Sequence, residues 1–410
     1  MNKKLMALAV TSVFTAPAFA QAPSGVTLYG RANLGLDNYA ATGATAANSD
    51  MKARNRVYDS GSRLGVRGVE DLGGGLRAVF QIESGVNMDN GGQNGQAGTA
   101  NSSAGFLGSR PSFVGLEGGF GRLTFGRQDV WWGNGTISQT GANYVSTDMP
   151  FLTGNNGRVQ AGIARQSNVM QYTTPTFGGF NTTLSYSPDT GPNGPTGAAF
   201  VNSESQQANL NVDARLLALT ARWAGGPISV QVDYSQKQAA SVAGVTNRPK
   251  NVNLKASAGF TYSPGAQLSM LVSQLKNNDV LATAGFSALG DDVKSTAIGL
   301  MWEHAFGPIQ ALAQAGIVRK ATGCTESVGA VAGVSGSTCE KTGAKVWMLG
   351  ARYNLSKRTA SYLTFNQTKN DANATMDYTG GSYTSSGAAG YNLLAGSDPR
   401  IISLGVWHQF

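Results

Sequence analysis

Apolar and polar side chains alternate with a period of two along most of this 410-residue chain. In one such run, Ile228, Val230 and Val232 are separated by serine and glutamine. Successive side chains of a β-strand point to opposite faces, so each run predicts a strand with one apolar and one polar face. The clearest runs cover residues 26–37, 180–186, 228–235, 252–262 and 402–410. No stretch of comparable length keeps the helical period of about 3.6 residues, and we therefore predict an all-β protein.

The lengths of these runs and of the segments between them indicate the architecture. Several runs reach ten residues or more, whereas strands of soluble proteins average about 5–6 residues and membrane-crossing strands need about 9–11. Seven short turns are predicted near 71–75, 118–121, 175–179, 225–227, 263–266, 306–308 and 355–357. Eight longer segments rich in Gly, Asn, Ser and Thr lie near 39–57, 88–104, 129–164, 188–206, 238–250, 277–292, 320–341 and 370–398.

This arrangement predicts a 16-stranded antiparallel transmembrane β-barrel, with short turns and both chain ends on one side and long loops on the other. A barrel satisfies the membrane's demand that every backbone group find a partner, because its sheet closes on itself. A soluble β-sandwich or a secreted β-rich adhesin would show the same alternation and is the alternative.

Composition excludes several other classes. Only 13% of the residues are charged, about half the usual share, but no run of 18 apolar residues exists that would make a membrane-spanning helix. Two cysteines and two histidines supply no zinc site built on these ligands, so no metal and no cofactor are expected. The basic residues are scattered and accompany no recognition motif, which argues against binding of nucleic acid.

The N-terminus has the three parts of a secretory signal peptide. Lys3 and Lys4 precede an apolar stretch at 5–13, and Ala18-Phe19-Ala20 is a small-x-small cleavage site. We therefore predict a signal peptide at 1–20 and a mature barrel domain at 21–410, with a buried N-terminal helix as the alternative.

Export would place Cys324 and Cys339 in an oxidising compartment, where a disulfide is expected. Two free thiols are the alternative, because spacing alone does not prove pairing.

The apolar register also predicts which side chains face the barrel interior. Leu64 and Val66 point outward, which turns Arg63 and Arg67 inward. The same parity places further cations in the lumen, namely Arg31, Arg77 and Arg122. A water-filled passage with such walls would enrich anions. The alternative is that these are solvated charges without any effect on selectivity.

The third long segment, at 129–164, has 36 residues, and loops longer than about 15 residues are usually functional or disordered. It contains several apolar side chains, namely Trp131, Trp132, Tyr144, Met149 and Phe151. We expect this loop to fold into the barrel and narrow the passage. An external loop covered by protein is the other interpretation.

Four segments resemble trimeric general porins of the beta-proteobacterial type: Ser62–Leu76, Arg110–Leu116, Phe120–Gln128 and Arg165–Phe180. With the signal peptide and the terminal Phe410, the likeness covers the whole chain. It implies a homotrimer of barrels in the outer membrane, each with its third loop forming a constriction. By motif matching, the arginine cluster facing that loop would be Arg63, Arg110 and Arg165. Asp129 and Asp148 are the acids of the loop and are candidates for the opposing wall.

Taken together, these features predict passive diffusion of small hydrophilic solutes and ions across the outer membrane, with a preference for anions and no catalysis. A channel selective for phosphate or carboxylates is the alternative, and saturable conductance would identify it. A barrel enzyme would need a base beside a nucleophile, whereas His304 and His408 have apolar parity and are expected to be interfacial aromatics. Surface cations could contact the phosphates of lipopolysaccharide.

Overall fold

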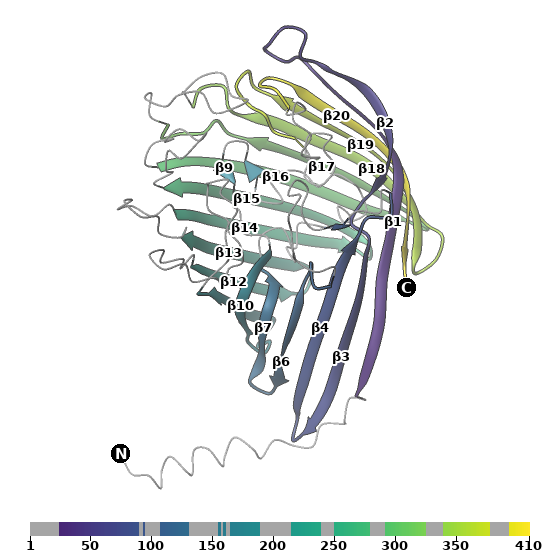
Figure 1. The fold of residues 1–410 in the computed structure, drawn as a ribbon, viewed down its shortest axis with the longest axis vertical. Helices are drawn as coiled ribbons and strands as arrows, with labels where there is room; N and C mark the ends of the chain where they lie inside the picture. Colours follow the sequence, from purple (N-terminus) through teal and green to yellow (C-terminus); the bar gives the residue numbers. More distant parts are fainter. Residues whose placement is uncertain are drawn as a thin grey trace.

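The computed structural model describes residues 24–89, 93–94, 107–130, 155–156, 159–160, 165–188, 215–238, 250–278, 292–324, 339–377 and 393–410. Figure 1 shows that the long strands wrap around a common interior. The strands of the wall are β1 (Gly25–Thr42), β2 (Met51–Asp59), β3 (Arg63–Gly73), β4 (Leu76–Val86), β6 (Ser112–Gly118), β7 (Gly121–Asp129), β10 (Arg165–Thr173), β11 (Phe180–Ser187), β12 (Leu216–Gly225), β13 (Ile228–Gln238), β14 (Lys250–Ser263), β15 (Ala266–Asn278), β16 (Asp292–Phe306), β17 (Ile309–Val318), β18 (Ala344–Asn354), β19 (Thr359–Asn370) and β20 (Asp398–Gln409). Three two-residue strands are β5 (Gln93–Asn94), β8 (Asn155–Asn156) and β9 (Val159–Gln160).

The sheet closes because its last strand pairs with its first. β20 pairs antiparallel with β1 along Arg31–Thr42, and each wall strand except β2 and β3 pairs with its neighbours along the chain. β1 also pairs with β2 in its second half and with β3 in its first half, so β2 and β3 share one strand position. Among the described residues the wall is therefore a closed, antiparallel, 16-stranded barrel. The prediction of a 16-stranded antiparallel barrel is confirmed.

The tight turns lie where the sequence predicts them. Each of the seven predicted turns joins two neighbouring wall strands, and β1 begins and β20 ends on the same side as these turns. At one of them, Gly226 has a φ of 56°, a conformation that favours glycine. None of the described residues belongs to a helix long and apolar enough to cross a membrane.

The first long loop is shorter than predicted. The segment predicted as a loop at 39–57 consists largely of strand, because β1 continues to Thr42 and β2 begins at Met51. Here the strands are held by polar pairs in place of apolar alternation. Asp37 lies opposite Arg56 in the register, and the two form a salt bridge at 3.0 Å between Arg56 Nε and Asp37 Oδ1.

The outer face of the barrel is apolar, as the alternation predicts. On β12, Leu217 and Leu219 are exposed, whereas Leu216 and Ala218, which point the other way, are buried. Exposed apolar side chains recur on every second position of most wall strands. A folded protein that exposes so large a continuous apolar surface requires a lipid environment.

Both histidines lie on the outer face among aromatic side chains. The His304 ring is stacked against Trp302 and lies 4.3 Å from the Phe306 ring, centroid to centroid. His408 is similarly near Phe410 and contacts the hydroxyl of Thr359. Such aromatic residues near the ends of barrel strands form the interfacial girdle of membrane barrels.

Part of the inner face is apolar, which the rule of a polar interior did not predict. Leu271 and Met348 are fully buried, although their neighbours along the strand are exposed on the outer face. We call this region the apolar inner wall; it lies on β15–β18, is completed by Met376, and comprises Leu271, Ala297, Met301, Leu312, Val318, Ala344, Val346, Met348 and Met376.

Candidate functional site

A cavity of about 460 Å³ lies inside the barrel against β1, β3 and β4. Four arginines line it, and three of them were placed in the lumen by parity alone. The full lining is Tyr29, Gly30, Arg31, Arg63, Arg67, Gln81, Glu83, Arg110, Pro111, Asp129, Gln409 and Phe410. With four arginines and two acidic side chains among the described residues, the surface of this cavity carries an excess of positive charge.

The strand register brings these side chains together. Arg63 lies opposite Arg31 across the β1–β3 pair. On the other side of β3, Arg67 lies opposite Gln81 of β4. Because alternate residues of a strand share a face, Arg63 and Arg67 point into the barrel while Leu64 between them is exposed outside.

Glu83 holds the second arginine of the predicted cluster. Its carboxylate accepts a hydrogen bond from Arg110 Nε at 2.5 Å and another from the Tyr29 hydroxyl at 2.9 Å. The backbone N–H of Arg110 also donates to the Glu83 carbonyl at 3.0 Å. Glu83 therefore fixes the position of Arg110 and neutralises part of its charge.

Asp129 holds the third arginine. Arg165 Nε donates to Asp129 Oδ1 at 2.7 Å, and the two residues are paired in the register of β7 and β10. The expectation that Asp129 is a loop acid facing the arginines from an opposing wall is wrong, because β7 continues to Asp129 and strand pairing places it beside Arg165. Asp148 lies outside the described residues.

Arg63 differs from these two arginines. Among the described residues its guanidinium has no hydrogen-bond or ion-pair partner, although it interacts electrostatically with Arg110, Glu83 and Arg165. It contributes to the cavity a positive charge that no carboxylate of the described residues contacts.

Sequence reasoning missed Arg127, which lies beside the same cluster. Its Nη1 donates to Ser167 Oγ at 2.8 Å, and it interacts electrostatically with Arg165 and Asp129. Gly126 before it has a φ of 145°, and a Cβ there would lie 2.2 Å from the Ser112 carbonyl oxygen. The positive φ of Gly126 interrupts the simple alternation of β7. In the sequence this irregularity is visible only as Phe-Gly-Arg.

The remaining predicted lumen cations lie where parity placed them. Arg77 and Arg122 flank Glu117 in one row across β4, β6 and β7. Arg77 forms a salt bridge with Glu117, and Arg122 Nε lies 4.0 Å from its other carboxylate oxygen. Arg31 donates to the carbonyls of Ser60 and Gly61 at 3.1 and 2.8 Å. We call Arg31, Arg63, Arg67, Arg110, Arg127 and Arg165, with Glu83 and Asp129, the basic inner wall.

Comparison with known proteins decides the family. A family model described as Gram-negative porin matches residues 7–373. The chain belongs to the Gram-negative porin family. This porin is 28% identical to an outer membrane porin protein of Bordetella pertussis, over 91% of this chain and 95% of that protein. It is also 28% identical to outer membrane porin protein 32 of Delftia acidovorans, over the full length of both.

A solved structure agrees with these relatives. The anion-selective porin from Comamonas acidovorans has a TM-score of 0.67 and 25% identity to this porin, covering 95% of this chain and all of that one. The porin is thus an outer-membrane channel for passive diffusion. Because the family consists of channel proteins, the expectation that the chain is not an enzyme is confirmed. Within the described residues no group of three His, Cys, Asp or Glu side chains could hold a metal ion.

Proposed function

We propose that this porin conducts small hydrophilic solutes and ions with a preference for anions, and that Arg63, Arg110 and Arg165 form the basic side of its constriction. The observation that carries the proposal is the excess of arginine in one cavity of the barrel interior. Among the described residues, Arg31, Arg63, Arg67 and Arg110 line the cavity, and Glu83 and Asp129 are its only acidic side chains. Low-dielectric walls lined by one sign of charge raise the local concentration of the opposite ion.

The size of the passage decides whether such charges matter. At ordinary salt concentrations, screening reduces electrostatic interactions beyond about 10 Å. Charges in a wide lumen therefore have little effect, whereas an ion that enters a cavity of about 460 Å³ comes within that distance of the arginines that line it. The anion selectivity named for the Comamonas acidovorans porin, which shares this fold, supports the same preference here.

We further propose that the third loop folds into the barrel as the other side of this constriction. Two observations support this. The short hairpin of β8 and β9 lies against β15 and β16, far around the barrel from β7 and β10, between which the loop runs (Figure 1). The apolar inner wall occupies the same strands, and buried apolar side chains need a partner that excludes water. The tryptophans Trp131 and Trp132 lie outside the described residues.

The assembly and export of the protein are also proposals. We infer a homotrimer, as the family resemblance implies. Each chain is exported through a signal peptide that is cleaved after Ala20, and surface cations of the assembled trimer contact lipopolysaccharide. Light scattering of the detergent-solubilised protein and N-terminal sequencing test these points. We expect three chains per particle and a mature protein that begins at Gln21. A monomer, or a mature protein that still carries Met1, would contradict them.

A substrate-selective anion channel is the second candidate, and one observation favours it. Arg63 brings a guanidinium that has no carboxylate partner within the described part of the chain to a cavity with room for a phosphate or carboxylate group. Conductance in rising phosphate or succinate concentration separates the two candidates. A conductance that saturates at millimolar concentration indicates a binding site, and one that rises in proportion to concentration indicates diffusion alone.

The test of the main proposal is the reversal potential of purified protein in a planar bilayer under a potassium chloride gradient. We expect stable ion conductance and a chloride-to-potassium permeability ratio above one. Conductance with a ratio below one would contradict the anion preference. Absence of conductance would contradict the channel itself.

A further inference from the structure

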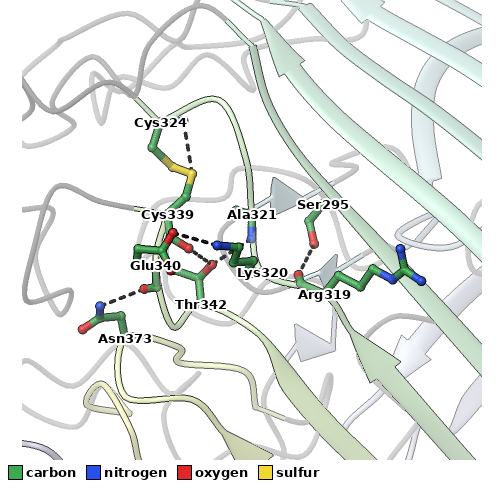
Figure 2. Close-up of a disulfide and its surroundings, with 9 residues drawn as sticks. All are labelled: Ser295, Arg319, Lys320, Ala321, Cys324, Cys339, Glu340, Thr342 and Asn373. Carbon is green, nitrogen blue, oxygen red and sulfur yellow. Dashed lines mark hydrogen bonds and ion pairs between the residues drawn. A yellow bond between two sulfur atoms is a disulfide. The ribbon is translucent and has the colours of Figure 1, made fainter.

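A disulfide joins the two chain segments that connect β17 and β18 to the seventh long loop (Figure 2). Cys324 follows β17 and Cys339 precedes β18, with their Cα atoms 5.4 Å apart. They are the only two cysteines of the chain. We call residues 319–324 and 339–343 the loop-7 base.

The loop-7 base is tied together by more than the disulfide. The backbone N–H of Ala321 donates to Thr342 Oγ1 at 2.8 Å, and this hydroxyl donates to the Cys339 carbonyl at 2.7 Å. Lys320 Nζ and Glu340 Oε1 form a salt bridge at 2.7 Å. Figure 2 shows these contacts gathered directly beneath the disulfide.

The disulfide packs into a buried apolar cluster inside the outer end of the barrel. Cys324 and Cys339 lie against this cluster, which comprises Val130, Leu216, Ala218, Leu275, Val293 and Ala321. Leu216 is completely buried, whereas Leu217 beside it is exposed on the outer face, so the cluster lies on the inner face. The loop-7 base is therefore packed on the lumen side of the barrel and not on its lipid side.

One member of this cluster connects the disulfide to the candidate constriction. Val130 is completely buried and directly follows Asp129, the residue that holds Arg165. It is also the first residue after β7, where the third loop begins. The position of the loop-7 base thus bears on the point at which the third loop leaves the wall.

The loop-7 base is also joined to the eighth loop. Asn373 donates from its side chain to the Glu340 carbonyl and from its backbone to the Lys341 carbonyl, both at 2.8 Å. Within the eighth loop, the carbonyl of Ala372 in turn accepts a hydrogen bond from Thr45 Oγ1 of the first loop at 3.0 Å. Segments of three loops are therefore connected across one side of the outer mouth.

We propose that the Cys324–Cys339 disulfide is a clamp that holds the loop-7 base inside the outer mouth and steadies the start of the third loop. The inference rests on the proposed function only in taking the third loop as part of the constriction. A cross-link acts by restricting the states that the joined segments can reach. When the bond is opened, the two cysteine side chains separate, the cluster loosens, and the current through the channel fluctuates more.

The experiment is reduction of the native protein while a single channel conducts in a planar bilayer. Dithiothreitol transfers two electrons and two protons to the bond, yields two cysteine thiols and closes into its own cyclic disulfide. Because the chain has no other cysteine, any effect of the reductant on the protein arises at this bond. We expect low-frequency current noise to increase about twofold or more and mean conductance to rise, since segments released from a cross-link sample more open states.

The controls separate this effect from damage to the barrel. The double variant Cys324→Ser/Cys339→Ser should show the noise of the reduced protein without any response to dithiothreitol. Thr342→Val, which removes two hydrogen bonds of the loop-7 base but leaves the disulfide, should give noise between the two. If the serine variant does not fold, reduction of the inserted native channel still provides the test.

The outcomes are distinct. Unchanged noise and conductance in channels whose two thiols are shown by maleimide labelling to be free would overturn the clamp. An equal response of the serine variant to dithiothreitol would also overturn it. Absence of any current before reduction would contradict the proposed function instead.

Discussion

The basic inner wall and the apolar inner wall face the same barrel interior but meet different surroundings. On β3 and β4, inward positions carry arginine and glutamate and border a cavity. On β15–β18, the equivalent positions carry Leu271, Met348 and their neighbours, and they are buried. Both follow the same period-two alternation. The comparison shows that alternation predicts the direction of a side chain, whereas residue chemistry indicates whether that side of the lumen holds water or packed protein.

The largest effect is expected on stability, when a carboxylate is placed in the apolar inner wall and compared with the same carboxylate in the basic inner wall. Met348 is fully buried, so Met348→Asp would bury a carboxylate without a partner and should lower the free energy of unfolding by about 3 kcal/mol or more. Arg63→Asp puts the same carboxylate beside an open cavity and should change the free energy of unfolding by about 1 kcal/mol or less. Thermal unfolding followed by circular dichroism compares the two. Equal losses of stability would contradict the distinction between the walls.

Glu83→Gln should have the next largest effect, and it acts on selectivity. Removing the carboxylate leaves Arg63 and Arg110 without their nearby negative charge. We expect the chloride-to-potassium permeability ratio to rise about twofold, because a charge a few ångströms from the ion path is only partly screened. The measurement is the reversal potential in a salt gradient.

Tyr29→Phe is the matched control for that variant. It removes the hydroxyl that donates to Glu83 but keeps the carboxylate, so the ratio should change little. If both variants raised the ratio equally, the arrangement of the hydrogen bonds would matter and the charge of Glu83 would not.

A smaller rise in the same ratio is expected for Asp129→Asn. The side chain of Asp129 is 27% exposed, compared with 8% for Glu83, so water already screens more of its charge. We expect an increase of about 1.5-fold by the same reversal-potential measurement. A decrease would show that Asp129 acts only by positioning Arg165.

The smallest effect is expected for Arg122→Gln. The Arg122 side chain is 42% exposed and shares Glu117 with Arg77. It does not line the cavity. Its loss should change the permeability ratio by less than about 1.3-fold, because solvent screens it more than the cavity arginines. A change as large as that of Glu83→Gln would move the selective region away from the cavity.

Much of the fold could be predicted from the sequence because membrane barrels impose strict local rules. Alternation indicated the outer face, and short glycine-containing turns such as Gly225–Pro227 indicated the strand boundaries. The exceptions lie outside the apolar band. The prediction of a loop at 39–57 failed because Asp37 and Arg56 extend the pairing through a salt bridge, and polar strands of this kind have no hydrophobic signal.

The site could be predicted only in part. Parity and motif matching found Arg63, Arg110 and Arg165, but not their partners. Asp129 meets Arg165 through the register of β7 and β10, which shifts at a bulge between Gln166 and Val169 that the sequence does not display. Glu83 meets Arg110 through a backbone hydrogen bond and a salt bridge before β6 begins. Arg127 was missed because the irregularity at Gly126 interrupts the alternation. The apolar inner wall was missed because an inward leucine and an outward leucine are identical in a sequence.

The most direct test of the central claim is the permeability ratio of the double variant Arg63→Glu/Arg165→Glu, measured beside the native protein in planar bilayers under a potassium chloride gradient. If the basic inner wall sets the ion preference, the chloride-to-potassium ratio falls well below the native value while the channel still conducts. A conducting double variant with the native ratio would show that these arginines do not govern the passage of ions.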